Sequence, residues 1–491
     1  FWCWFWFCFW SWFCVFLVLC LTPIPIRSRR LARPLESRPV SDTLRRVTHY
    51  AFVLQVLIGG AFVVGTAAVL RNRFFATFTT VLLTVQGITA IAFWPRYAWA
   101  APAFVYLQAC VHLHFLSLSR ARMRPLAWRL LISIPGLFFG AIMLFGLPWG
   151  IVALFGRTPY GVEFVFVAAA FGVIESLYTR EQAVDVVLDG EDVGAQRRVR
   201  LSKPSQEASA RHEPLRVVQI TDPHLGPLMS VRRLRRICER AVARDPHLVL
   251  LTGDFLTMES HADPMVLEDS LRPLAAISDR VFACFGNHDH EAPELVRGVC
   301  RTLGFTLLVD EETTVETDAG PVQLVGADYV FGKRHAHLTA LAEKYPRRED
   351  HLRIWLLHDP GAFRHIPEGE ADLVFSGHTH GGQVGLVSLG IPWTFVSAFT
   401  PIPDFGFWGR GPDRLYVHRG TGVYGFPLRV GVAGPLAGIT RVTEQLLNAD
   451  LIVGLDSATI RATRAPGVVE CRLGIRVVGL VPQPPVEDRG S

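Results

Sequence analysis

The sequence lacks several patterns that define common classes of protein. Its nine cysteines are scattered through 491 residues and none is in a CxxC pair, so neither a disulfide framework nor a cysteine-based zinc site is indicated. It has no G-x-S-x-G turn to present a nucleophilic serine. The net charge is +5, but no basic stripe with interleaved aromatic residues occurs in the second half of the chain. We therefore expect no nucleic-acid partner.

Apolar residues are in excess, and the excess lies at the front of the chain. Half of all residues are hydrophobic and the mean hydropathy is positive, which is high for a soluble protein. Residues 1–22 are almost purely Phe, Trp, Cys and Leu, with no initiator Met and no basic segment, so they are no ordinary signal peptide. They are either an apolar span or an artefact of translation upstream of the true start. Residues 23–49 are polar and carry seven arginines.

Four apolar stretches follow, each long enough for the roughly 20 residues that a transmembrane helix needs. They are Tyr50–Leu70, Phe74–Trp94, Ala98–Leu118 and Leu130–Phe155. A fifth, Phe164–Ile174, is short and is either a marginal span or an interfacial helix. We expect a membrane domain of four or five helices over residues 50–178. If the arginines of residues 23–49 are cytoplasmic, a spanning fifth stretch places the second half of the chain outside, and a non-spanning one places it inside.

Two histidines, His112 and His114, lie inside the third apolar stretch. Ionisable residues within a membrane are functional candidates by default. Because both lie towards the end of the stretch, we expect them instead to reach the interface or a neighbouring carbonyl group.

Five short apolar runs in the second half of the chain each stop at residue types that bind metals. They are Leu215–Ile220 before Asp222 and His224, Leu248–Leu251 before Asp254, Val281–Phe285 before Asn287, Ile354–Leu357 before His358, and Leu373–Phe375 before His378 and His380. Each run is expected to form a buried strand. In α/β sheets, ligands gather outside the carboxyl ends of the strands, so we expect these side chains to converge on one crevice.

Each of these residues also has a structural explanation when taken alone. Asp222 could cap a helix, Asn287 could lie in a turn, and His358 could be a packed core histidine. Together these explanations fail, because they do not explain why metal-binding residue types occur at the ends of five expected strands.

A helix is expected between the first two runs. Val231–Val242 has an apolar face and five arginines elsewhere, which predicts a helix packed on a sheet in a βαβ unit.

The ligand-type residues fall into five sequence blocks: DxH, GD, GNHD, a lone His and GHTH. The order and spacing of these blocks resemble the five-block signature of calcineurin-like metallophosphoesterases. The local sequences are most similar to the membrane-associated bacterial branch of that family; they read TDPHLGP, LLTGD, FGNHDH and SGHTHGGQ. The resemblance covers Leu215 to Thr443. It implies an α-helical transmembrane bundle followed by an α/β domain, a β-sandwich flanked by helices. The implied reaction is hydrolysis of a phosphate ester, diester or pyrophosphate by metal-activated water attacking in line.

The resemblance also implies roles for individual residues. Asp254 bridges two divalent ions, and the remaining ligands divide into two sets: Asp222, His224 and His380 for one ion, and Asn287, His358 and His378 for the other. No thiolate is offered, so Mn²⁺, Fe or Zn²⁺ fits the donors. His288 binds the phosphate or protonates the leaving oxygen, oriented by Asp289. Asp328 and Arg419 are candidates for contacts to substrate or to ligands; the alternatives are a surface turn and a solvated arginine.

The resulting hypothesis is a multi-pass membrane phosphoesterase, placed by resemblance in a bacterial inner or plasma membrane, with a lipid-linked phosphate as one candidate substrate. We expect a linker over residues 179–214, a metallophosphoesterase domain over 215–445 and a loose tail over 446–491. The main alternative is a membrane sensor or scaffold with a non-catalytic phosphoesterase-like module, and a transporter is a second. All seven ligand positions are filled, which disfavours the first, and the apolar stretches show no internal repeat, which disfavours the second.

Overall fold

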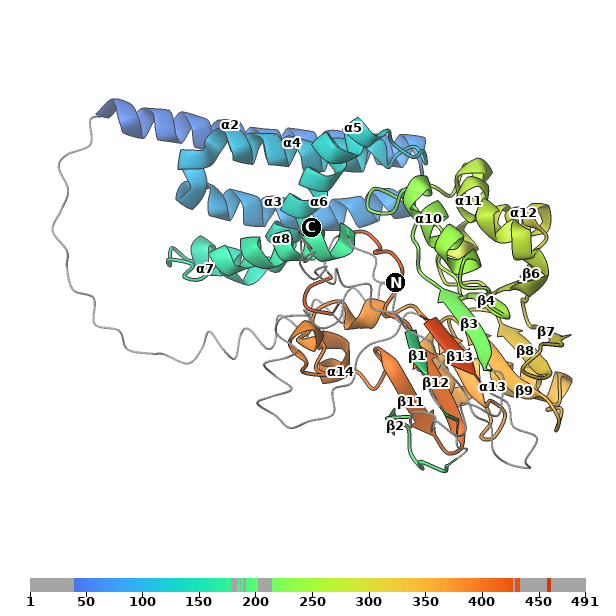
Figure 1. Cartoon of the computed structure of the whole chain (residues 1–491). Helices are drawn as coiled ribbons and strands as arrows, with labels where there is room; N and C mark the ends of the chain where they lie inside the picture. The colour runs from blue at the N-terminus through green and yellow to red at the C-terminus, as the bar shows by residue number, and fades with distance from the viewer. Residues whose placement is uncertain are drawn as a thin grey trace, which may run out of the picture. The chain divides into compact units, whose positions relative to one another are not determined.

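The computed structural model describes residues 39–177, 183–185, 187–188, 191–201, 214–426, 429–432 and 457–460 (Figure 1). The apolar stretch 1–22 and most of the Arg-rich segment therefore lie outside the described residues. The chain divides into two compact units. A helical unit comprises residues up to Val173 together with Gly425–Leu428, and an α/β unit comprises the remainder.

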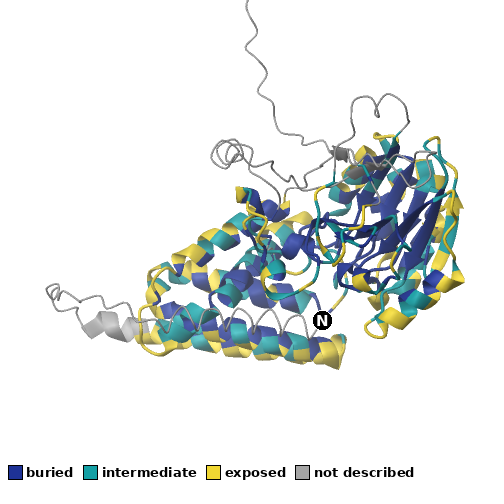
Figure 2. Cartoon of the chain, turned by 90° about the horizontal axis from the view of Figure 1, so that it is seen from below, coloured by how far each residue is buried: buried dark blue, intermediate teal, exposed yellow. Residues whose placement is uncertain are grey.

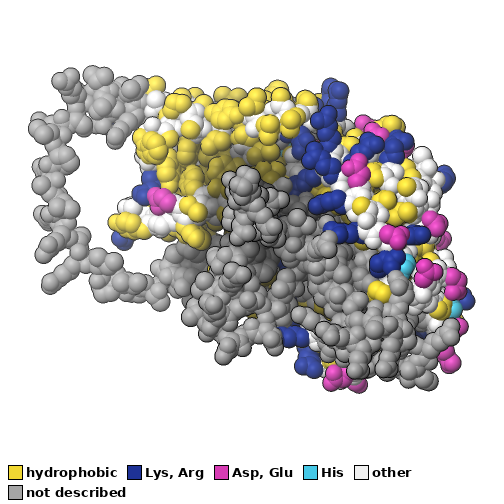
Figure 3. Space-filling view, viewed as in Figure 1, with side chains coloured by type: hydrophobic (Ala, Val, Ile, Leu, Met, Phe, Trp, Pro, Cys, Tyr) yellow, Lys and Arg dark blue, Asp and Glu magenta, His cyan; other side chains and the backbone are white. Residues whose placement is uncertain are grey.

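The helical unit contains three continuous helical stretches that are long and apolar enough to cross a membrane, Arg46–Leu70, Arg73–Ser117 and Leu126–Phe145. Its helices are α2 (Pro39–Leu70), α3 (Arg73–Tyr97), α4 (Ala101–Ser117), α5 (Leu126–Trp128), α6 (Ile134–Phe145), α7 (Leu147–Leu154) and α8 (Glu163–Leu177). The second stretch holds two predicted spans, α3 and α4, joined by a short 3-10 turn at Ala98–Ala100. Apolar side chains cover much of the visible surface of this unit (Figure 3), as a lipid environment requires.

The predicted span Leu130–Phe155 is wrong as a single helix. It is divided into α6 and α7, and α7 packs against α3. Pro148 lies at the first turn of α7, where its missing N–H costs nothing, whereas inside one long helix it would break a hydrogen bond and clash with the preceding turn. Helix α8 has 15 residues and therefore spans only about 22 Å, which is less than the roughly 30 Å of a bilayer core.

The expectation for His112 is also wrong. His112 is buried and lies 3.0 Å from the side-chain amide of Gln108. That amide pairs in turn with Gln86, which is on α3. Side-chain hydrogen bonds of this kind join neighbouring helices where lipid offers no alternative partner. His114 is buried as well, with its ring against Phe115.

The α/β unit is built on two sheets. The first runs in the order β1-β13-β3-β4-β5-β6, with strands Ala183–Asp185, Ser457–Ile460, Leu215–Ile220, Leu248–Leu251, Val281–Ala283 and Thr306–Leu307. The second runs in the order β2-β11-β12-β10-β9-β8-β7, with strands Arg197–Arg198, Gly406–Arg410, Asp413–Val417, Leu373–Ser376, Leu352–Leu357, Val322–Ala327 and Glu311–Val315. The five strands predicted before ligand residues correspond to β3, β4, β5, β9 and β10.

One hydrophobic core joins the two sheets. Val217 and Leu250 of the first sheet belong to the same buried cluster as Leu324, Ile354 and Phe375 of the second. Figure 2 shows buried residues concentrated in the strands of this unit. Helices α10 (Val231–Val242), α11 (Pro264–Leu271) and α12 (Pro293–Leu303) pack against one another, and α13 (Arg334–Lys344) packs on the outer face of the second sheet. The predicted β-sandwich flanked by helices is therefore confirmed.

Segments outside the expected domain are also part of this unit, among them β1 of the predicted linker, which pairs with β13. Described residues 191–201 of the predicted linker lie along the second sheet, where β2 pairs with β11 and the backbone of Val193 donates to Gly411. In the predicted loose tail, β13 pairs antiparallel with β3. These strands have at most four residues, so none carries enough alternation for its sequence to predict a strand. The rest of the tail lies outside the described residues.

Candidate metal centre

The predicted ligands lie at the carboxyl ends of strands in both sheets. Asp222, Asp254 and Asn287 follow β3, β4 and β5, which are parallel neighbours in the first sheet. His358 and His378 follow β9 and β10, which are parallel neighbours in the second. Parallel strands bring their carboxyl ends to the same edge of a sheet, so each sheet contributes one cluster of side chains.

Six of the seven predicted ligands form two groups whose donor atoms lie within 4.8 Å of one another. The groups are Asp222, His224 and His380, and Asp254, His358 and His378. The same oxygen of Asp254, Oδ2, lies 3.6 Å from His224 Nε2 in the first group and 3.2 Å from His358 Nε2 in the second. This carboxylate therefore faces both groups. The seventh residue, Asn287, has a buried Oδ1 with no hydrogen-bond partner in the described part of the chain.

Backbone carbonyls orient three of the imidazoles. The Nδ1 atoms of His224, His358 and His380 lie 3.4, 2.7 and 3.2 Å from the carbonyls of Leu256, Thr252 and Gly422. A carbonyl only accepts, so each Nδ1 carries a proton and each Nε2 faces the centre. His224 Nε2 and His380 Nε2 lie 3.2 Å apart, an arrangement suited to two ligands of one cation.

The backbone is strained at these positions. Among the described residues, nine non-glycine residues have positive φ, and five of them are predicted ligands: Asp222, His224, Asp254, His378 and His380. Left-handed backbone costs non-glycine residues of order 1–3 kcal/mol each and is concentrated at functional sites. Gly377 has a related role, since a Cβ there would lie 2.1 Å from Asp222 Oδ2.

Burial sets the charge states of the centre. It lowers the pKa of His224 to about 3 and that of His378 to about 4, and it also lowers the pKa of His380, so these imidazoles are neutral at pH 7, the form that binds metal. Burial alone would raise the pKa of Asp254, but the charge of His358 outweighs it and the pKa falls well below its usual range. Burial lowers the pKa of His358, but the carboxylates of Asp254 and Asp222 outweigh burial and raise it to about 10, so a divalent ion bound there would take the place of a proton. The donors are thus a carboxylate pair, four imidazoles and an amide oxygen, which fit two divalent ions.

His288 borders the centre, and its partner is not the predicted one. Its Nδ1 lies 3.0 Å from a carboxylate oxygen of Glu291, whose other oxygen lies 3.5 Å from His261. Asp289 instead accepts backbone N–H groups from Asp254, Phe255 and Gly286, at 2.7 to 2.9 Å, and so joins two ligand loops. The prediction that Asp289 orients His288 is wrong, because Asp289 points into the protein.

Burial lowers the pKa of His288, but the carboxylates of Asp254 and Glu291 outweigh burial and raise it above its usual range. The ring of Tyr424 stacks on His288 with a centroid separation of 4.1 Å and lies 5.0 Å from that of His224. Sequence reasoning missed both Glu291 and Tyr424. Glu291 was detectable as a carboxylate three residues after His288, whereas nothing local to Tyr424 indicates its long-range contact.

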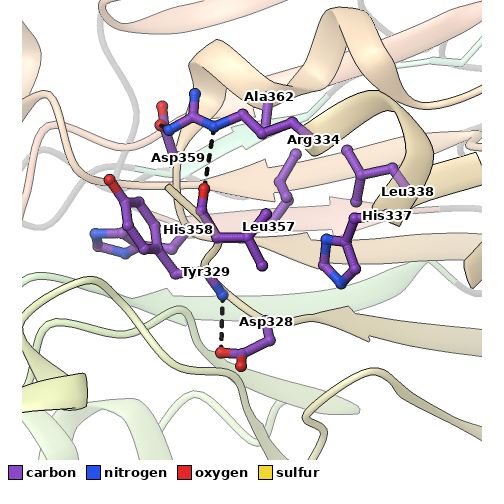
Figure 4. A pocket seen from close by; sticks show the side chains of 10 residues that line it. Asp328, Tyr329, Arg334, His337, Leu338, Leu357, His358, Asp359 and Ala362 are labelled. Atoms are coloured by element: carbon purple, nitrogen blue, oxygen red, sulfur yellow. Dashed lines mark hydrogen bonds and ion pairs between the residues drawn. The ribbon is translucent and has the colours of Figure 1, made fainter. Parts of the chain in front are cut away.

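The two remaining candidates have defined partners. Asp328 lies 2.9 Å from His290 and accepts the N–H of Tyr329, beside a pocket lined by Tyr329, His358 and Asp359 (Figure 4). Arg334 reaches Asp359 at 2.6 Å on the same wall.

Arg419 is buried rather than solvated. It donates to the carbonyl of Val432, and its side chain lies against Gly381, next to the ligand His380. It therefore supports the loop that carries His378 and His380. Neither the surface turn nor the solvated arginine is found.

Comparison with known proteins agrees with this geometry. Residues 215–382 match the model of the calcineurin-like phosphoesterase family. Phosphodiesterase YaeI of Escherichia coli (strain K12) is 28% identical over 225 residues, covering 44% of this chain and 78% of that protein. A zebrafish (Danio rerio) transmembrane protein with metallophosphoesterase domain is 28% identical over 249 residues, which is 46% of this chain and 52% of the relative.

A third relative, UDP-2,3-diacylglucosamine pyrophosphatase LpxG of Chlamydia trachomatis, is 25% identical over 269 residues, covering 42% of this chain and 78% of the relative. Residues 215–382 contain the strands and loops that bring the ligands together, and they form a calcineurin-like phosphoesterase domain, the domain of metal-dependent phosphoester hydrolases.

Proposed function

We propose that this chain is a membrane-anchored hydrolase that uses two divalent ions to cleave a phosphodiester or pyrophosphate bond in a lipid-linked substrate. The observation that carries the proposal is the position of Asp254 Oδ2, which faces a ligand of each group. We assign the ions to Mn²⁺, Fe or Zn²⁺ and the protein to a bacterial inner or plasma membrane. The filled set of seven ligand positions argues against a non-catalytic sensor module.

The residues of the metal centre and those beside it have different roles in the proposed hydrolysis. When bound, two adjacent divalent ions polarise a phosphoryl group and activate water. His288 is placed to donate a proton to the leaving oxygen, and the carboxylates of Asp254 and Glu291, which outweigh burial, raise its pKa. Glu291 holds the ring through Nδ1, and Tyr424 stacks on its face, so both fix the direction of Nε2.

A lipid-linked substrate is supported by the membrane helices. Three stretches of the helical unit are long and apolar enough to span a bilayer, so the active site is covalently attached to a membrane protein. One relative is named for a diacylated sugar nucleotide and its pyrophosphate bond, which combines lipid and phosphate in one molecule. If the purified full chain cleaves only small soluble esters and no lipid phosphate tested, the lipid-linked substrate is wrong.

The experiment that tests the mechanism compares leaving groups. We expect His288→Ala in the full chain to keep its bound metal and its melting temperature. It should lose roughly 10²–10⁴-fold in rate on alkyl phosphodiesters, whose leaving oxygen needs a proton, and much less on bis(p-nitrophenyl) phosphate. His351→Ala, which removes a histidine paired with Asp350, is the control and should leave both rates unchanged. Equal losses on both substrates would show that His288 binds phosphate without donating a proton.

A further inference from the structure

An uncharged segment follows the ligand loop of the α/β unit. From Val384 to Pro403 the sequence VGLVSLGIPWTFVSAFTPIP contains no Asp, Glu, Lys, Arg or His. It forms a 3-10 turn at Val387–Leu389 and the short helix α14 (Phe395–Phe399), and it is bonded to its neighbours. Leu386 donates to the carbonyl of Trp393, and Gly385 donates to that of Val430. The segment is therefore a defined structure, attached directly to the loop that carries His378 and His380.

This segment has an inner and an outer face. Val387 and Val396 are buried, and Val387 packs with Phe405 and Val432. Four large apolar side chains point outward and are between 39% and 45% exposed: Leu386, Leu389, Ile391 and Trp393. They are half of the eight exposed large apolar side chains described in the α/β unit, and they lie within eight residues of sequence. Clustered apolar exposure of this kind marks an interaction surface.

The buried side of this segment is hydrogen-bonded to the end of an apolar helix. Glu175, in the last turn of α8, is buried and accepts hydrogen bonds from the Ser388 hydroxyl at 3.2 Å and the Gly431 N–H at 2.9 Å. All three residues belong to the α/β unit, because the unit boundary falls between Val173 and Ile174. Ile174 and Leu177, which flank Glu175, are two more of the eight exposed apolar side chains.

The exposed side chains and the length of α8 indicate what contacts the outer face. Its exposed apolar side chains, Phe164, Val167, Ile174 and Leu177, recur at helical spacing along one side. The helix is too short to span a bilayer and belongs to a chain with three helical stretches that are long and apolar enough to do so. A short apolar helix face can contact lipid near the surface of the bilayer, the depth at which tryptophan is enriched.

We propose that Leu386, Leu389, Ile391 and Trp393, continued by Ile174 and Leu177, form a lipid-contact surface that inserts into the bilayer interface beside the metal centre. A protein interface has a polar rim around its apolar core, and the segment offers no charged side chain to form such a rim. A lipid surface needs only apolar area and the absence of charge. The surface would place the ligand loop against the headgroup layer, where a lipid-linked phosphate lies.

The test is photo-crosslinking in vesicles of phosphatidylcholine. The full chain is reconstituted with a benzophenone amino acid at position 389 or 393, irradiated and analysed by mass spectrometry. Since both side chains point outward, the substitutions leave the buried face of the segment intact. We expect lipid adducts at both positions.

The controls are the same amino acid at Met265 and Phe331, the two exposed large apolar residues of the α/β unit outside the surface. They should give at least tenfold fewer lipid adducts. Equal lipid labelling at all four positions, no lipid adduct at 389 and 393, or adducts to protein instead would overturn the proposal. Because no step requires turnover, failure here leaves the proposed hydrolysis untouched, and failed hydrolysis leaves this surface untouched.

Discussion

Among single residues, Asp254 connects the two halves of the metal centre. Its Oδ2 faces His224 and His358, and its Oδ1 accepts the backbone N–H of His288 at 2.8 Å. We expect Asp254→Asn to remove most of the bound metal at both positions. The loss in kcat/KM should exceed the roughly 10–100-fold typical of residues that only orient a ligand. Metal analysis and steady-state kinetics on the same sample measure both effects.

Asp245→Asn is the matched control for Asp254→Asn. Asp245 also has positive φ but lies in an exposed turn, paired with Arg216 and Arg280. We expect full metal content and rate for this variant. Near-normal turnover in Asp254→Asn would show that Asp254 does not bridge two ions.

A second residue-scale prediction concerns pH and His337. The Nε2 of His337 lies 2.8 Å from Asp310, and this hydrogen bond raises the pKa of His337. A raised folded-state pKa gives stability that is full below the unfolded value of about 6.5 and is lost as pH rises through the higher value. The pKa of Asp310 is lowered, so Asp310 stays ionised across this range.

We therefore expect the melting temperature of the α/β unit in the full chain to fall as pH rises from about 6 to 9. In His337→Gln the melting temperature should decrease less over the same pH range. The same variant of the neighbouring His335, which has no carboxylate partner among its described contacts, should leave the slope unchanged. An identical slope in wild type and His337→Gln would contradict the assignment.

The sequence identified the ligand residues better than their supporting contacts. Asp222, His224, Asn287, His358 and the HxH pair could be predicted because each directly follows an apolar run, so the strand ends place them together. Glu291 and Tyr424 could not be placed in the same way. The role of Glu291 depends on the conformation of the loop after β5, although its spacing of three residues from His288 was visible in the sequence. Tyr424 contacts His224 across 200 residues of sequence, which no local pattern contains. Asp289 was misassigned because adjacent side chains can point in opposite directions.

At the scale of elements, strand β2 is held to the second sheet by a buried ion pair. Arg198 binds the carboxylate of Asp404 and stacks over Phe405 at 4.0 Å. Asp404 is fully buried, while the Arg198 side chain is 19% exposed. We expect Arg198→Ala to lower the free energy of unfolding by roughly 2–3 kcal/mol, below the roughly 3–5 kcal/mol typical of a fully buried pair. Thermal unfolding of the full chain measures the change.

The neighbouring Arg197 provides the control for this prediction. Its side chain is exposed and donates to the carbonyl of Val193, so Arg197→Ala should change stability by less than about 0.5 kcal/mol. If both variants unfold at the wild-type temperature, the described part of the predicted linker does not stabilise the sheet.

Elements with strong periodicity were the most predictable. The bounds of β3, β4 and α10 agree with those read from the sequence, because buried strands are continuous apolar runs and α10 has a clear apolar stripe. The break between α6 and α7 was missed because both helices are apolar throughout, so composition alone continues across it. Pro148 was the available signal.

For the whole molecule, the metal centre joins the two sheets of the α/β unit. Removal of metal should therefore destabilise the unit as a whole. An ion present at a hundredfold excess over its Kd stabilises by about 2.7 kcal/mol, equivalent to roughly 5–10 °C for a unit of this size. We expect a chelator to lower the melting temperature by at least this amount and excess Mn²⁺ to restore it.

A chelator-treated Asp254→Asn sample is the control, because a variant that holds little metal should respond weakly. Wild-type chain whose melting temperature is unaffected by both the chelator and Mn²⁺ would contradict a structural link through the centre.

The division of the ligands between two sheets also affects the order in which the centre can form during synthesis. His224 and His380 lie 156 residues apart in sequence, and at roughly 5–20 residues per second the ribosome needs about 8–30 s to pass from one to the other. Throughout that interval the nascent chain displays the ligands of the first sheet without those of the second. A truncated or stalled chain therefore contains only part of each ligand group, and hydrolytic activity can appear only after both sheets have been made and packed together.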